Sequence, residues 1–68
     1  MKLIDVMNTL FLNQRVRIVK LDRETETVTK EYFKGHVLKL ATAPYEYLHD
    51  ATVKNVFIED DTLTIGIE

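Results

Sequence analysis

The sequence predicts an α+β domain: a four-stranded, mostly antiparallel sheet with short helices, in the order α-β-β-α-β-β. Three observations carry this prediction. An apolar stripe at helical spacing opens the chain, two stretches rich in β-branched residues follow, and the outline of a short helix before a hairpin returns in the second half. Strongly twisted strands can also curl, so a small bent β-barrel with helical insertions is the alternative.

The first expected helix places its apolar residues at i, i+1, i+4, i+7 and i+8, which gathers them on one face. These residues are Leu3, Ile4, Met7, Leu10 and Phe11. Asn8 and Asn13 are weak helix formers, so the helix is expected to end between Thr9 and Leu12.

Two strands are expected next, over residues 15–21 and 28–34, with the polar run 22–27 as the loop between them. Pairing of Ile18 with Tyr32 sets the expected register. One face then holds Val16, Ile18, Val28 and Tyr32, and the other holds Arg17, Val19, Leu21 and Phe33. Gly35 is expected to end the second strand.

Residues 36–50 are expected to form a broken helix or two consecutive helical turns. Pro44 interrupts any single helix here, but it suits the first turn of a new one. Tyr45 and Leu48 are expected to face inward from that second turn, with Tyr47 as a further candidate.

The last two strands form the best specified hairpin. A two-residue connection at Asp60 and Asp61 pairs Ile58 with Leu63 and Val56 with Ile65. It also pairs Phe57 with Thr64 and Asn55 with Gly66. One face then carries Val56, Ile58, Leu63, Ile65 and Ile67, as a half-buried antiparallel hairpin requires.

The composition is that of one small domain spanning residues 1–68. No cysteine is present, which excludes disulfides and thiolate metal sites and fits a reducing compartment. Neither a signal peptide nor an apolar run long enough to cross a bilayer is found, so a cytoplasmic location without membrane contact is expected. The charge is unevenly distributed along the chain. Residues 1–40 contain eight Lys and Arg and five acidic residues, whereas residues 41–68 contain one Lys and six acidic residues.

No catalytic, cofactor-binding or metal-binding residue is predicted. Glu59, Asp60 and Asp61 lack the spacing and the glycine of a calcium loop, and a hairpin turn explains them better. His36 and His49 are expected near helix ends, where a histidine interacts favourably with the terminus. The chain has no serine or cysteine to act as a nucleophile, so an enzyme is not expected and no small-molecule substrate is evident.

Protein association is the leading functional prediction, because the sheet face opposite the expected core carries an unusual apolar load. This candidate protein interface consists of Val19, Leu21, Phe33, Val53 and Phe57. A short chain without disulfides gains stability from self-association, so we expect this face, or the edge strand beside it, to form a homodimer or to dock a partner protein.

Two other functions stay open. The basic first hairpin favours contact with nucleic acid, since basic side chains beside aromatic ones form stacking platforms. The candidate contacts are Arg15, Arg17, Lys30 and Lys34. The acidic second half favours a charge-mimicking inhibitor of a host or phage protein.

The order of the segments LIDVMNTL, RVRIV, EYFKGHV and NVFIEDDTLTIGI resembles small uncharacterised proteins encoded by phages and prophages of Gram-positive bacteria. The residues that carry the resemblance are Tyr32 or Phe33 with Gly35, then Asp60, Leu63 and Ile65. The segment PYEYLHD departs from the plainer helix of that pattern. The resemblance implies a cytoplasmic phage accessory protein and brings no catalytic or binding residue with it.

Overall fold

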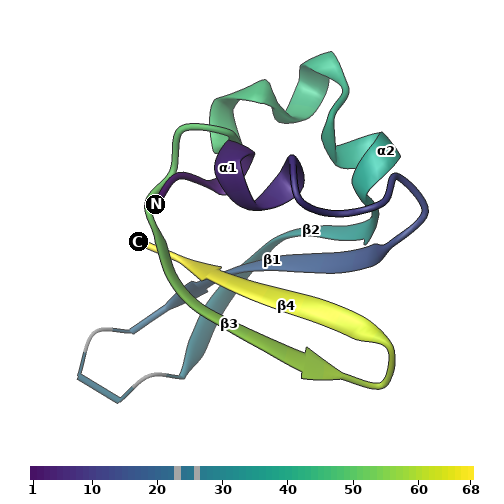
Figure 1. The fold of residues 1–68 in the computed structure, drawn as a ribbon. Helices are drawn as coiled ribbons and strands as arrows, with labels where there is room; N and C mark the ends of the chain where they lie inside the picture. The colour runs from purple at the N-terminus through teal and green to yellow at the C-terminus, as the bar shows by residue number, and fades with distance from the viewer. Residues whose placement is uncertain (23, 26) are drawn as a thin grey trace.

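The computed structural model of the chain describes residues 1–22, 24–25 and 27–68, and it confirms the α+β class and the order of the elements (Figure 1). The elements are α1 (Leu3–Met7), β1 (Arg15–Leu21), β2 (Val28–His36), α2 (Val37–Leu40), the 3-10 helix η1 (Ala43–Leu48), β3 (Val53–Glu59) and β4 (Thr62–Ile67). The predicted loop positions Arg23 and Glu26 lie outside the described residues.

The four strands form one open sheet in the order β2-β1-β4-β3. Both hairpins, β1–β2 and β3–β4, are antiparallel, and the two central strands β1 and β4 run parallel. This arrangement matches the predicted mostly antiparallel sheet rather than a closed barrel. It also leaves β2 and β3 as the two edge strands.

All three helices lie on one side of the sheet, which we call the helix-covered face (Figure 1). The other side, which no helix covers, is called the open face. The hydrophobic core lies between the helices and the helix-covered face. Its buried members are Leu3, Val6, Met7, Val16, Ile18, Phe33, Val37, Leu40, Leu48, Ile65 and Ile67.

The first hairpin has a different register from the one predicted. Ile18 pairs with Phe33 instead of Tyr32, and the register shifts between Ile18 and Val19, where Tyr32 stands unpaired as a β-bulge. Phe33 is therefore buried in the core. Its ring packs edge-on against the ring of Tyr45, with 4.8 Å between the two ring centroids. Tyr32 also packs against the core. Strict alternation would send one of these adjacent aromatic rings to the open face, so the bulge allows both to reach the same side.

Two element ends also differ from expectation. Strand β2 continues through Gly35 to His36, and α1 ends at Met7, earlier than predicted. Gly35 lies beneath the Phe33 ring, because a Cβ at this position would come 3.1 Å from Phe33 Cζ. The glycine thus makes room for the aromatic ring rather than ending the strand. Residues 36–50 do form two separate turns, α2 and η1, with Pro44 at the start of the second.

The final hairpin has the predicted register throughout, including Ile58 with Leu63 and Phe57 with Thr64. Its two-residue turn gives both Asp60 and Asp61 positive φ values, 49° and 63°. This backbone is that of a type I′ turn, which matches the twist of a hairpin but suits Asn and Gly better than Asp.

The turn can therefore be improved. Replacing Asp60→Asn together with Asp61→Gly should raise the free energy of unfolding by about 0.5–1 kcal/mol, because both new residues adopt positive φ more readily. The control Asp60→Ala/Asp61→Ala removes the same two charges but should lower stability, since alanine avoids this conformation. Denaturant unfolding followed by circular dichroism measures both. Equal effects of the two double variants would show that charge, and not backbone conformation, governs this turn.

Gly66 in β4 is a second position that has no room for a side chain. A Cβ there would lie 2.4 Å from Leu21 Cδ1 and 2.9 Å from Leu21 Cγ. Gly66 lies between Val19 of β1 and Asn55 of β3 in the sheet. The Leu21 side chain therefore packs directly over the β4 backbone on the open face, and Leu21 is buried there.

This contact makes a direct prediction. Gly66→Ala should lower the free energy of unfolding by about 1–3 kcal/mol, because the added methyl displaces Leu21. In a Leu21→Ala background the same change should cost much less, since the displaced side chain is gone. A double-mutant cycle by chemical denaturation measures this coupling. Additive costs in the cycle would mean that Leu21 does not set the need for glycine.

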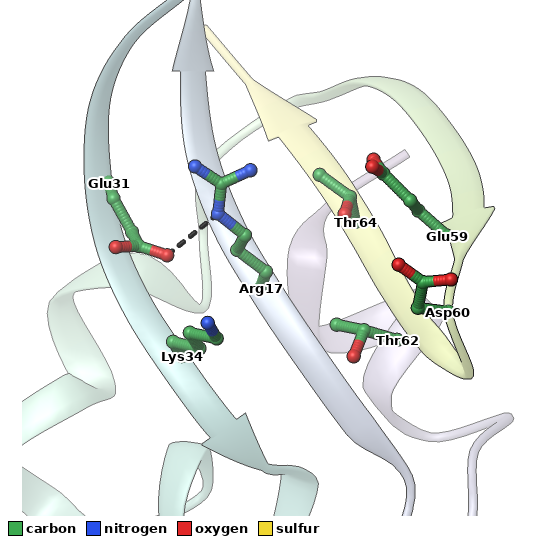
Figure 2. A pocket seen from close by; sticks show the side chains of 7 residues that line it. All are labelled: Arg17, Glu31, Lys34, Glu59, Asp60, Thr62 and Thr64. Atoms are coloured by element: carbon green, nitrogen blue, oxygen red, sulfur yellow. Dashed lines mark hydrogen bonds and ion pairs between the residues drawn. The ribbon is translucent and has the colours of Figure 1, made fainter.

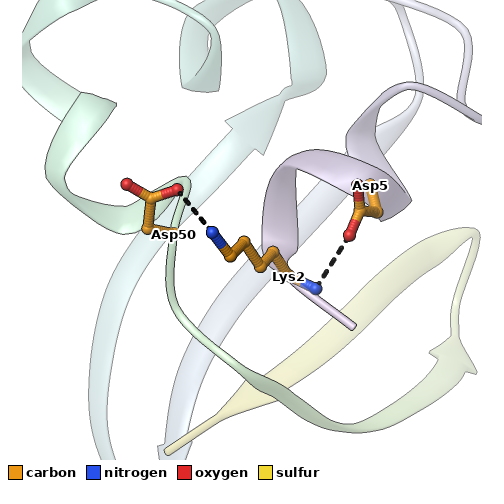
Figure 3. A network of polar contacts seen from close by, with 3 residues as sticks. All are labelled: Lys2, Asp5 and Asp50. Carbon is orange, nitrogen blue, oxygen red and sulfur yellow. Dashed lines mark hydrogen bonds and ion pairs between the residues drawn. The ribbon is translucent and has the colours of Figure 1, made fainter.

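The start of the chain is fixed against the segment before β3. Lys2 forms an antiparallel bridge with Thr52, and the Met1 carbonyl accepts a hydrogen bond of 2.8 Å from the Val53 N–H. Figure 3 shows the polar contacts beside this bridge: the Lys2 backbone N–H donates to Asp5 at 3.0 Å, and the Lys2 ammonium lies 3.6 Å from Asp50. The first residues thus occupy the outer side of the chain where β3 begins.

Candidate functional site

The predicted five-residue protein interface does not form one surface. Phe33 belongs to the core, and Val53 packs against it, so the prediction that both lie on the open face is wrong. Val19 and Leu21 do lie on the open face, but both are buried. Phe57, opposite Thr64 on the open face, is the one member with substantial exposure, at 40%.

A polar hollow of about 300 Å³ lies on the open face (Figure 2). Strands β1 and β2 contribute its basic side chains, and the β3–β4 hairpin faces them. Its lining consists of Arg17, Glu31, Lys34, Glu59, Asp60, Thr62 and Thr64. Arg17 Nε donates to Glu31 Oε1 at 2.7 Å, so this pair neutralises itself within the hollow. The lining carries two basic and three acidic side chains, a mixture that favours no anionic or cationic ligand.

The candidate nucleic-acid contacts divide between the two faces. Arg15, Arg17 and Lys34 lie on the open face. Arg17 of β1 is directly opposite Lys34 of β2 in the strand register. Lys30 lies on the other side, with its ammonium 4.9 Å from the centre of the Tyr32 ring. Arg17 and Lys34 also share the hollow with Glu59 and Asp60, whereas Arg15 does not line it. The structure therefore places three of the four on one face, and two of these three, Arg17 and Lys34, lie among acidic side chains rather than in a basic stripe.

The histidines have local structural positions. His36 is the exposed residue that precedes α2, and the His49 ring Nε2 lies 2.9 Å from the Leu40 carbonyl oxygen, within hydrogen-bond distance. Across residues 1–22, 24–25 and 27–68, no three His, Asp or Glu side chains are grouped so that they could hold a metal ion.

The outer strand β3 carries the most unusual surface. Every residue from Asn55 to Glu59 is exposed, and Val56 and Ile58 keep 44% and 77% of their surface exposed. The sequence pattern predicts these two side chains to be half-buried on the core side. Their register is as predicted, but the helices do not lie over the part of β3 that leads into the hairpin turn (Figure 1).

The short helices explain why this strand stays uncovered. The longest, η1, has six residues, and α1 has five. A five-residue helix is about 7.5 Å long, whereas four strands at about 4.8 Å spacing span roughly twice that width. The helices cover β2 and the inner strands but not residues 55–59 of β3 (Figure 1). Helix length is the sequence signal that could have revealed this exposure.

The backbone of β3 is also available for pairing. In a hairpin closed by a two-residue turn, Glu59 and Thr62 exchange hydrogen bonds, and the alternation continues to Phe57 and Thr64. Val56 and Ile58 therefore direct their N–H and C=O groups away from β4. Residues 55–59, with these outward groups and the apolar run Val56–Phe57–Ile58 at their centre, are called the β3 edge below.

The opposite edge strand, β2, is built differently. It exposes Lys30, Glu31 and Lys34, and two β-bulges interrupt its register. Charged side chains and bulges are the usual devices that prevent a strand from pairing with another chain. In β3 the one register shift lies before Asn55 and the charged residues Lys54 and Glu59 flank the apolar run, so residues 56–58 are the part of this edge that is open to a further strand.

Comparison with known proteins finds no matching family model, no similar curated protein and no similar solved structure. The resemblance to phage-encoded proteins therefore stays a prediction. Within the described part of the chain, none of the helices has the length and apolar character needed to traverse a bilayer.

The exposure of the β3 edge can be tested through stability alone. Ile58→Lys, measured on the dilute protein, should change the free energy of unfolding by less than about 0.5 kcal/mol, because this side chain is mostly solvated. Ile65→Ala, on the neighbouring strand and fully buried, should cost about 2–5 kcal/mol. A large loss for Ile58→Lys in thermal or chemical denaturation would place Ile58 in the core after all.

Proposed function

We propose that this protein is a non-enzymatic interaction module that self-associates through the β3 edge. The single observation that carries the proposal is the combination of exposed apolar side chains and outward backbone groups on one edge strand. An exposed hydrophobic edge of this kind adds a strand from another chain. Backbone hydrogen bonds then supply affinity, and the alternating side chains supply specificity.

The apolar side chains of the β3 edge lie on both faces of the sheet. Val56 and Ile58 lie on the helix-covered face, and Phe57 lies on the open face. An added strand would cover apolar surface on each side at once. Ile58 also borders a hollow whose other lining residues are Leu10, Gln14, Asp61 and Leu63, and the two leucines extend the apolar surface beyond the edge strand.

The two competing functions have weaker support. A nucleic-acid contact would rely on Arg15, Arg17 and Lys34, but Arg17 is already paired with Glu31 and the hollow also contains acids. A charge-mimicking inhibitor would use Glu59, Asp60 and Asp61, which do gather at one hairpin tip. Two of these three acids are accounted for by the turn itself.

Self-association should appear as a concentration-dependent increase in mass. Interfaces that bury less than about 1,200 Å² are usually weak, so light scattering or sedimentation should cover roughly 10–500 μM protein. Ile58→Lys should keep the protein monomeric across this range, because it places a charge within the apolar run.

The matched control is Leu38→Lys, which replaces another exposed leucine-sized side chain, 60% exposed on α2 and far from β3 in sequence. This variant should associate as the parent does. A parent protein that stays monomeric at the highest concentration contradicts the proposal, as does loss of association in both variants. Association that persists in Ile58→Lys would assign it to another surface.

A further inference from the structure

We infer that the occupant of the β3 edge is the β3 edge of a second copy, paired antiparallel about a two-fold axis that passes beside Phe57. This inference rests on the proposed function and specifies its geometry. It follows from three properties of the edge: which backbone groups point outward, which side chains meet in each register, and what already occupies the two ends of the strand.

The outward backbone groups restrict the register. Only Val56 and Ile58 within the β3 edge present N–H and C=O groups to a new strand, so these residues must face one another across the interface. The axis can therefore pass beside residue 56, 57 or 58, and never between two residues. Each choice brings together a different set of side chains.

With the axis beside Phe57, every side-chain pair is compatible. Phe57 meets Phe57 of the second copy on the open face, in a non-hydrogen-bonded pair where side chains approach closely. Val56 meets Ile58 of the second copy on the other face, and this contact occurs twice by symmetry. Asn55 lies opposite Glu59 of the second copy, so a neutral polar side chain faces each acidic one.

The other two registers are poorer. An axis beside Val56 places Glu59 of the second copy opposite Val53, whose N–H already donates to the Met1 carbonyl. The first residues therefore block that register. An axis beside Ile58 leaves only three residues paired, puts Phe57 opposite Glu59, and brings the two acidic turns side by side. Like charges facing one another on a sheet are destabilising.

The paired molecule would be a continuous eight-stranded sheet. A two-fold axis perpendicular to the sheet keeps both helix layers on the same side. Val56 and Ile58 from the two copies then lie side by side on the helix-covered face, between the two helix layers. Self-pairing thus packs against one another the apolar side chains that the fold of a single chain exposes.

The test uses the absence of cysteine from the chain. Phe57→Cys places two thiols beside the axis, at a Cα separation of about 4.5–5.5 Å that permits a disulfide. Under mild oxidation this variant should form a covalent dimer at least tenfold faster than Leu38→Cys, which reports random collision. Asn55→Cys alone should not cross-link, because its two copies lie about 14 Å apart in this register.

A mixture of two other cysteine variants retains Phe57 in both copies, so it controls for the loss of the Phe57–Phe57 contact in the Phe57→Cys variant. Asn55→Cys mixed with Glu59→Cys should give the mixed disulfide faster than either variant gives its own, because these two positions lie opposite one another. Addition of denaturant should abolish all the differences.

The outcomes separate the two proposals. A parent that forms dimers by light scattering, with neither Phe57→Cys nor the mixture faster than Leu38→Cys, overturns the register and leaves self-association standing. Faster cross-linking of Val56→Cys or Ile58→Cys than of Phe57→Cys moves the axis to that residue and also overturns the inference. A strictly monomeric parent removes the proposed function and the inference together.

Discussion

The parallel pairing of β1 with β4 is the constraint on which the rest of the structure depends. The first half of the chain folds into the β1–β2 hairpin and the second into β3–β4, and only this central ladder joins the two in the sheet. It buries Val16, Ile18 and Ile65 beneath the helices, and it brings Leu21 over Gly66 on the open face. Because β1 and β4 are the central strands, β2 and β3 are the edges, and this strand order leaves the outward backbone groups of β3 unpaired within the sheet.

Sequence patterns predicted what depends on neighbouring residues and missed what depends on distant ones. The register of the last hairpin follows from a two-residue turn and five alternating apolar side chains, so it could be read directly. The register of the first hairpin depends on whether Tyr32 or Phe33 packs beside Tyr45, thirteen or twelve residues further along the chain. Alternation alone cannot reveal a bulge that lets both rings reach one side.

The candidate site shows the same division. The sequence identified Phe57 as an apolar residue on the open face, because the final register is local. It placed Phe33 and Val53 there too, although one follows the missed bulge and the other precedes a register shift beside Asn55. Val56 and Ile58 have the pattern of core residues, and only the extent of the helices decides that they are exposed. Alternation determines the direction of a side chain, whereas coverage determines whether it meets water.

The hydrogen bond between Met1 and Val53 also affects which end of the chain should carry an affinity tag. The first residues run antiparallel to the start of β3, with Lys2 opposite Thr52. A peptide added ahead of Met1 that kept this course would continue along the β3 edge as a fifth strand of the same molecule. An amino-terminal affinity tag would thus compete with the proposed second copy for the edge, at a high effective concentration. A carboxyl-terminal tag follows the inner strand β4 instead and leaves that course unoccupied.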